Sequence, residues 1–266
     1  MAAVPVWNRP PAVEPKHGAP MKMAMREWAV AALDLVFPAL CPVCATPLAL
    51  GRRDPLCGGC WTAIERVVSP VCDICGLPFH VFGDAREVLG RAVRCGECAM
   101  APPAFDWARA GGVYAGPLRE AVQRLKFARR PALARPLGDL ILEQWAAWLP
   151  VVDAVVPVPL ARARERERGF NQAALLAERL ARGLGTRLEP RWLARARDTA
   201  PQTDLHGDER RANVCGAFIA SAAVAQRDVA LVDDVLTTGA TVSECARVLR
   251  AAGARSVGVL TVARVL

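Results

Sequence analysis

The segment from Val229 to Thr241, which reads VALVDDVLTTGAT, constrains the fold of this chain more than any other. A run of apolar residues predicts a buried strand, two adjacent acids follow at its carboxyl end, and a loop of small residues leads into a helix. Asp233 and Asp234 can accept hydrogen bonds from vicinal hydroxyls, whereas the amides of a helix N-terminus and threonine hydroxyls attract a phosphate. The segment therefore predicts a sugar-phosphate site, with the phosphate held by Thr237, Thr238, Gly239, Ala240 and Thr241.

An alternative interpretation is an ordinary strand-to-helix turn in which Thr241 caps the following helix. The pattern of apolar positions, paired acids and TTGAT more closely resembles the phosphoribosyl pyrophosphate (PRPP) loop of type I phosphoribosyltransferases, without a departure. Strand, acids, threonines and helix must all occur in order, so this pattern is far more specific than a glycine motif alone.

The chain after Phe105 alternates between apolar strands and helical patterns, which predicts a parallel sheet covered by helices on both faces. The expected strands are Asp153–Val156, Val229–Val232 and Val257–Val262. The expected helices are Tyr114–Phe127, Leu133–Trp148, Phe170–Leu184 and Val242–Ala252, the last ended by Gly253. Ligands bind at the carboxyl ends of such strands, where the acid pair lies.

Eight of the ten cysteines form four Cys-x-x-Cys pairs, and each pair places two thiolates on a tight turn that suits a tetrahedral ion. Sequential pairing predicts two zinc ribbons with twelve and nineteen residues between their pairs, the second of which is the more usual spacing. The predicted zinc ligands are Cys41, Cys44, Cys57 and Cys60 for the first ribbon and Cys72, Cys75, Cys95 and Cys98 for the second.

Disulfides and a redox dithiol are the alternatives to zinc, and crosswise sharing of ligands is an alternative to sequential pairing. A reducing cytosol disfavours disulfides, and neither disulfide nor redox chemistry requires four equally spaced pairs. A module this small buries too little apolar surface to fold without a cross-link or a structural metal, so we expect two structural zinc ions.

The formal net charge of +8 comes almost entirely from arginine, and Lys126 is the one lysine beyond the N-terminal tail. Its compact charge suits a phosphate, although a solvated helix position is an equal alternative. Arg162, Arg164 and Arg166 could face a pyrophosphate or a nucleic-acid backbone, but a solvated helix start with local glutamate pairs is slightly favoured. Arg168 adjoins a polar cluster that suggests a helix entry aimed at the site. The segment Asp198–Phe218 predicts either a flap over the ligand or a plain surface hairpin.

The chain resembles the ComF family, also called the ComF/GntX group, in four features. These are the four cysteine pairs, the Arg168–Gln172 stretch (RGFNQ), Gln202 with Arg210, Arg211 and Asn213, and the loop from Asp233 to Thr241. The resemblance covers nearly the whole chain from about Asp34. It implies a type I phosphoribosyltransferase fold in which Pro157, Val158, Pro159 and Leu160 stand in the position of a pyrophosphate loop. It also implies a link to natural competence or DNA uptake in some members.

These observations predict three parts: a disordered tail over residues 1–24, a helix (Arg26–Phe37) with a double zinc ribbon over 25–102, and a phosphoribosyltransferase-like α/β domain over 103–266. The most apolar stretch, Trp28–Leu40, is short and interrupted by a charge and a proline, so we expect no membrane span. It also lacks a convincing small-residue cleavage site, so we expect no secretory signal. A cytoplasmic protein is expected.

The expected function is binding of PRPP with Mg²⁺ and transfer of its phosphoribosyl group to an acceptor by displacement of pyrophosphate. Positioning and charge stabilisation would supply most of the catalysis. A second hypothesis is a non-catalytic accessory protein that holds single-stranded DNA or a DNA-processing partner through its zinc ribbons and basic surface. A third is a relative that shares only the fold and binds no ligand.

Overall fold

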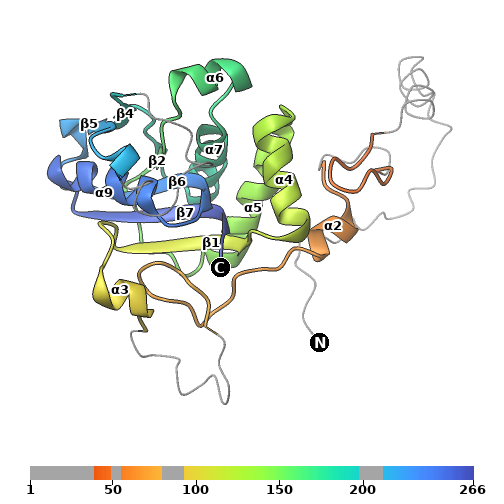
Figure 1. The fold of residues 1–266 in the computed structure, drawn as a ribbon, viewed down its shortest axis with the longest axis horizontal. Helices are drawn as coiled ribbons and strands as arrows, with labels where there is room; N and C mark the ends of the chain where they lie inside the picture. Colours follow the sequence, from red (N-terminus) through yellow and green to blue (C-terminus); the bar gives the residue numbers. More distant parts are fainter. Residues whose placement is uncertain (1–38, 49–54, 80–92, 198–211) are drawn as a thin grey trace, which may run out of the picture. The chain divides into compact units, whose positions relative to one another are not determined.

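The structure, a computed structural model, describes residues 39–48, 55–79, 93–197 and 212–266. Its centre is a five-stranded sheet in the order β1-β7-β6-β2-β3 with every neighbouring pair parallel (Figure 1). The strands are β1 (Trp107–Val113), β2 (Ala154–Pro157), β3 (Arg187–Leu188), β6 (Asp228–Leu236) and β7 (Ser256–Arg264), and a separate antiparallel pair consists of β4 (Leu193–Arg195) and β5 (Phe218–Ala220). The helices are α2 (Gly58–Thr62), α3 (Gly96–Met100), α4 (Gly116–Phe127), α5 (Ala134–Trp145), α6 (Arg162–Arg168), α7 (Gln172–Leu184) and α9 (Ala240–Ala251), with 3-10 turns at Pro131–Leu133 and Ala222–Val224.

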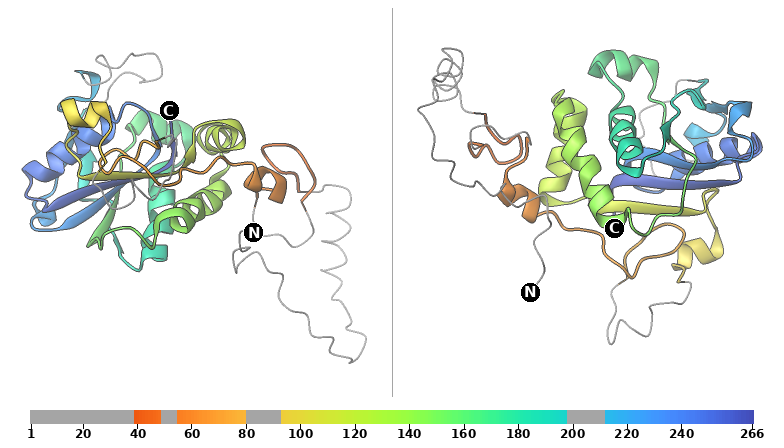
Figure 2. Two further views of the ribbon diagram at one scale, coloured as in Figure 1. Left: turned by 90° about the horizontal axis from the view of Figure 1, so that it is seen from below. Right: turned by 180° about the vertical axis from the view of Figure 1, so that it is seen from behind.

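Alternate side chains of the central strands enter two different cores, as expected for a sheet covered on both faces. In β6, Val229 and Leu231 pack with α9, whereas Ala230 and Val232 pack with α5 and α7. Figures 1 and 2 show the helices on both sides of the sheet. The predicted parallel sheet flanked by helices is thereby confirmed.

The strand that carries the acid pair is longer than the sequence pattern predicted. β6 continues through the acids to Leu236 because β7 extends equally far and pairs with it, Asp233 opposite Thr261 and Leu236 opposite Arg264. The acids therefore lie within the last part of the strand instead of after it.

The helix after this strand begins at Ala240, earlier than the predicted Val242, and its N-cap is Gly239 with a φ of +74°. Only glycine adopts this left-handed conformation without steric cost. Thr241 lies inside the first turn, so the alternative in which it caps the helix is wrong. At the other end, Gly253 has a φ of +96° and ends the helix as predicted.

The stretch from the second strand to α7 holds two helices where the sequence predicted one. The short helix α6 ends at Gly169, whose φ is +84°. α7 begins at Gln172 rather than Phe170, because the Asn171 side chain accepts a hydrogen bond from the amide of Ala173 at 2.9 Å and caps the helix. The remaining predicted helices and the strand near residue 154 are confirmed, with ends that differ by at most three residues from the prediction.

Residues 40–266 form one compact unit, so the cysteine-bearing segments and the sheet share interior contacts. The hydrophobic cluster that includes residues of α9 and β6 also includes four buried cysteines, Cys72, Cys75, Cys95 and Cys98. No helix in the described ranges is both long and apolar enough to span a bilayer. The predicted tail, the helix Arg26–Phe37 and residues 198–211 of the predicted flap or hairpin lie outside the described residues.

Candidate functional site

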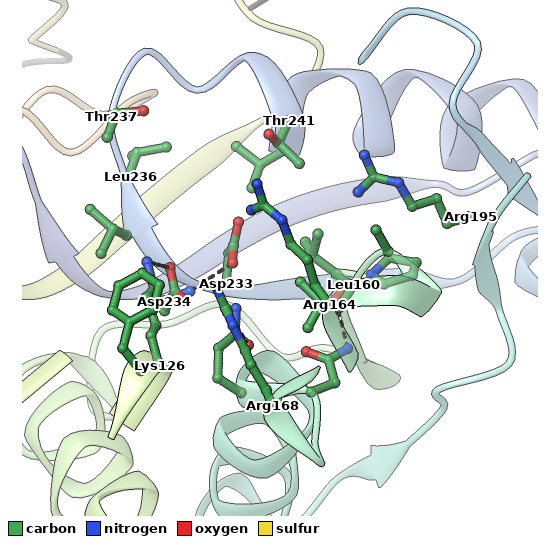
Figure 3. Close-up of a pocket in the computed structure, with 18 of the residues that line it drawn as sticks. Lys126, Leu160, Arg164, Arg168, Arg195, Asp233, Asp234, Leu236, Thr237 and Thr241 are labelled. Carbon is green, nitrogen blue, oxygen red and sulfur yellow. Dashed lines mark hydrogen bonds and ion pairs between the residues drawn. The ribbon is translucent and has the colours of Figure 1, made fainter. Parts of the chain in front are cut away.

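A cavity of about 860 Å³ opens at the carboxyl ends of β2 and β6 (Figure 3). Its walls come from the end of α4, the loop that follows β2, the helices α6 and α7, and the segment that joins β6 to α9. Predicted site residues in these walls are Lys126, Val158, Pro159, Arg168, Asp233, Asp234, Thr237, Gly239, Ala240 and Thr241. Ten of the eleven predicted residues therefore surround one space.

Lys126, one of the predicted site residues, forms an ion pair with the second acid of the pair, Asp234. Asp234 is 4 % exposed, and its Oδ1 lies 2.8 Å from the Nζ of Lys126, which comes from the last turn of α4. Burial lowers the pKa of Lys126, but the charge of Asp234, the hydrogen bond to it and the charge of Asp233 act together and raise that pKa above its ordinary value. Lys126 is thus not a solvated helix residue: it lines the cavity and its charge is paired with the acid. A contact with a phosphate remains a prediction.

The second oxygen of this carboxylate, Asp234 Oδ2, is buried and has no hydrogen-bond partner in the described structure. A buried carboxylate oxygen without a donor is energetically costly, so such an atom at a cavity wall points to a ligand that supplies one.

Asp233 is half-buried, and its Oδ1 accepts a hydrogen bond from the amide of Asp234 at 2.8 Å. Burial, together with the charge of Asp234, raises the pKa of Asp233 to about 7, although Lys126 and Arg168 oppose this shift. The side chain therefore changes its charge near neutral pH. In that range it can act as a proton-sensitive acceptor or cation ligand.

The segment Thr237–Thr241, here called the phosphate loop, separates two cavities. Thr237, Gly239, Ala240 and Thr241 line the large one, whereas Thr238 lines a cavity of about 510 Å³ on the other side together with Thr237, Gly239 and Ala240. The Thr238 hydroxyl accepts a hydrogen bond from the amide of Ala240 at 3.4 Å. Thr238 thus stabilises the start of α9 from the side of the smaller cavity. Its predicted contact with a phosphate remains a prediction.

The loop after β2 is tied to α7. The Asn171 amide group donates a hydrogen bond to the carbonyl of Val158 at 3.0 Å, and the amide of Val158 donates to Val232 of β6 at 2.9 Å. Val158 and Pro159 therefore stay in the same cavity wall as the acid pair, at the position for which the family resemblance implies a pyrophosphate loop.

Arginines line the mouth of the cavity. Arg168 lies over the ring of Phe127 at 5.2 Å and donates a hydrogen bond to Gln172 at 2.9 Å. Burial lowers the pKa of Arg168, whereas the two acids oppose this change. Figure 3 shows its side chain with those of Arg164 and Arg195 around the acids.

Some of the lining cations differ from the sequence interpretation. Arg162 and Arg166 are exposed, as a solvated helix predicts, but Arg164 lines the cavity. The spacing of Arg164 and Arg168, four residues apart on one helix face, is the signal that could have identified it. Arg129 and Arg195 also line the cavity, and no local pattern marks them.

The eight paired cysteines form two clusters, here called the first tetrad (Cys41, Cys44, Cys57, Cys60) and the second tetrad (Cys72, Cys75, Cys95, Cys98), each with its sulfurs within 4.8 Å of one another. All ten cysteines of the chain lie in described residues and are free thiols. Pairs of sulfurs are 3.5, 3.6 and 3.9 Å apart, close to the ~3.8 Å expected for ligands about 2.3 Å from a tetrahedral zinc ion. Sequential pairing is confirmed, and both tetrads fit zinc.

Comparison with known proteins agrees with this arrangement. The model of the family described as "Double zinc ribbon domain" matches residues 32–99. The DNA utilization protein YhgH of Salmonella typhi is 37% identical over 240 residues, which cover 87% of this chain and 100% of that protein. Competence protein F of Haemophilus influenzae is 33% identical over 222 residues, covering 80% of this chain and 91% of that protein.

Among solved structures, a glutamine PRPP amidotransferase from B. subtilis, in complex with ADP and GMP, matches with 21% identity and a TM-score of 0.38. The match covers 53% of this chain and 30% of that one, so this chain spans less than a third of the solved protein. The relatives in sequence, at this identity and coverage, show that the chain belongs to the ComF family, with the DNA utilization protein YhgH and competence protein F.

Proposed function

We propose that this protein binds PRPP with Mg²⁺ in the large cavity and transfers the phosphoribosyl group to an acceptor. The observation that carries the proposal is the unpartnered Oδ2 of Asp234 beside the half-buried Asp233, at the wall of a cavity closed by a helix N-terminus. Two carboxylates can accept hydrogen bonds from the vicinal hydroxyls of a ribose. The amides at the start of α9 and the hydroxyls of Thr237 and Thr241 suit its 5′-phosphate.

The proposed site also has cations for the negative charge of the ligand's pyrophosphate group. A pyrophosphate group attached to the ribose would lie toward the loop at Val158 and the guanidinium groups of Arg164 and Arg168, which bind phosphate oxygens in a planar, bidentate manner. The carboxylate of Asp233 is one donor in this wall that suits Mg²⁺, a hard cation that prefers oxygen ligands and would neutralise charge on the pyrophosphate.

The proposed reaction breaks the bond between C1 of the ribose and the pyrophosphate oxygen and forms a bond from C1 to the acceptor nucleophile. Pyrophosphate leaves with the bonding electron pair, and the acceptor gives up its proton. Positive charge develops on the ribose in the transition state, and the carboxylates of Asp233 and Asp234 lie where they stabilise it. The chain itself contributes orientation and charge, without a covalent intermediate.

Isothermal titration of PRPP and MgCl₂ into the full-length zinc-loaded protein tests the binding step. We expect saturable binding in the wild type and its loss in the double variant Asp233→Asn/Asp234→Asn. Glu165→Gln, which removes one exposed acid from α6, is the control and should bind like the wild type. Unchanged affinity in the double variant would contradict the assignment, and pyrophosphate release with added nucleobases then tests turnover.

We also propose a role in the handling of DNA, as an alternative or an addition. The relatives are named for DNA utilization and competence, and Arg162 and Arg166 of α6 are exposed beside the cavity mouth. Fluorescence anisotropy with a labelled single-stranded oligonucleotide tests it. The double variant Arg162→Met/Arg166→Met should weaken binding and lower the slope of log affinity against log salt concentration by about 1.4. An unchanged slope would exclude this surface. The proposed setting is the cytoplasm, where reducing conditions prevent disulfides and leave the tetrad cysteines available to bind zinc.

A further inference from the structure

Arg264, the last residue of β7, connects the second tetrad to the sheet. It is 6 % exposed, and its Nη1 donates a hydrogen bond to the carbonyl of Cys75 at 2.6 Å. Its Nη2 lies 3.5 Å from the sulfur of the same cysteine. An ion held by four thiolates leaves a net negative charge, and a buried guanidinium next to it compensates that charge.

The same arginine lies beside the strand that leads into the phosphate loop. Arg264 is the register partner of Leu236, and the amide of Val265 donates to the carbonyl of Leu236 at 2.9 Å. Leu236 is the residue immediately before Thr237. A displacement of Arg264 is therefore transmitted through one pair of backbone partners to the start of the loop.

The rear of the phosphate loop rests on the segment that follows the second tetrad. A Cβ on Gly239 would lie 3.8 Å from the ring of Phe105, and the amide of Ala104 donates to the Ser243 hydroxyl of α9 at 3.1 Å. Thr238 and Gly239 share the wall of the smaller cavity with Cys75, Cys98 and Arg264. Two routes thus join the second tetrad to the loop.

The first tetrad lacks such a route in the described part of the chain. Within the described residues its sulfurs contact one another, the Thr46 hydroxyl and the amide of Cys60. Its buried members belong to the hydrophobic cluster on the opposite face of the sheet, with α4, α5 and α7.

We propose that Arg264 is a positioning residue through which the second tetrad, and not the first, holds the phosphate loop in its ligand-ready conformation. That the loop binds a phosphate rests on the proposed function. The coupling itself does not, because it concerns the conformation of the loop in the free protein.

Hydrogen–deuterium exchange of the full chain, loaded with zinc, tests the coupling directly. Cys60→Ser and Cys98→Ser form a matched pair, because each removes the buried fourth cysteine of a tetrad from a short helix. We expect exchange at the amides of Ala240 and Ser243, which donate to the Thr238 hydroxyl and the Gly239 carbonyl and so report on the loop, to be about tenfold faster in Cys98→Ser and unchanged in Cys60→Ser. A tenfold change is the size expected for losing a hydrogen bond to a charged group. Native mass spectrometry should show one zinc lost in each.

Two further variants keep all eight ligands in place. Arg264→Met should accelerate loop exchange to a similar extent, and Arg264→Lys, which retains the charge, should restore part of the protection. Exchange in α7, on the opposite face, reports global unfolding. If Cys98→Ser or Arg264→Met unfolds globally, the test rests on Arg264→Lys. We then expect faster exchange in the loop and unchanged exchange in α7.

The proposal would be overturned if the loop exchanged equally fast in the two cysteine variants. It would also be overturned if a folded Arg264→Met exchanged like the wild type, or, where Arg264→Met unfolds, if Arg264→Lys did so. Titration of PRPP into the same proteins separates the two claims. Absence of PRPP binding in the wild type refutes the proposed function and leaves the exchange result standing. Binding in the wild type with an unresponsive loop refutes the role of Arg264 alone.

Discussion

The ion pair between Lys126 and Asp234 should be among the most costly contacts to break in this protein. The side chains are 19% and 6% exposed and their charged atoms are 2.8 Å apart. At an effective dielectric constant of about 20, Coulomb attraction at this distance is about 6 kcal/mol, part of which offsets the desolvation of both groups. Substitution Lys126→Met leaves a buried carboxylate unpaired, and we expect a loss of about 3 kcal/mol in the free energy of unfolding.

Urea unfolding of the zinc-loaded protein at pH 8, followed by circular dichroism, measures this loss. A change of this size lowers the midpoint by about 1 M. Arg124→Met is the matched control on the same helix: Arg124 pairs with Glu120 at 2.7 Å, but their side chains are 48% and 38% exposed, so the expected loss is only about 0.3–0.5 kcal/mol.

A double-mutant cycle identifies the cause of the effect. In Lys126→Met/Asp234→Asn the unpaired charge is absent, and most of the lost stability should return. A midpoint in Lys126→Met no lower than that of Arg124→Met would refute the reasoning, and so would a double variant less stable than Lys126→Met alone.

Three further predictions concern the cavity and the sheet. Because the raised pKa of Asp233 is about 7, protons compete with Mg²⁺ for this carboxylate at lower pH, and the titrated affinity for PRPP should fall about tenfold per pH unit below 7. Arg168→Met should weaken PRPP binding about 10-fold to 100-fold, whereas the exposed Arg162→Met should not. Gly258→Ala should destabilise the fold by about 1–3 kcal/mol in urea, because the new Cβ would lie 2.0 Å from the ring of Trp107.

Each of these has its own check. Affinity that stays constant from pH 8 to pH 6, or a pH dependence that persists in Asp233→Asn, argues against a proton on this carboxylate. Equal effects of the two arginine substitutions would mean that both act through general charge. For the sheet, Gly96→Ala is the neutral comparison, because a Cβ there meets nothing within 4 Å.

Local patterns predicted the parts of the fold that short-range physics determines. Spacing alone identified the partners in each cysteine tetrad, and hydrophobic runs identified β6, β7 and the helix between them. Their ends were missed because strand length depends on the neighbour: β6 extends past Asp233 only because β7 is there to pair with it.

The site was predicted in so far as it lies within one segment. Asp233, Asp234 and most of the phosphate loop could be assigned from the order of residue types. Arg129 and Arg195 reach the cavity from elements far away in sequence, and the partner of Lys126 could not be known before α4 was placed against β6. Such contacts depend on tertiary packing, which no periodicity encodes.

The interior position of the second tetrad has a consequence for how the family can diversify. Cys75 and Arg264, 189 residues apart, meet in the core, so a change in the ribbon backbone near Cys75 must be matched at the end of β7. Chimeras that exchange this ribbon between relatives should regain solubility only when the last strand is exchanged with it, and aligned homologues should show correlated substitution at the two places.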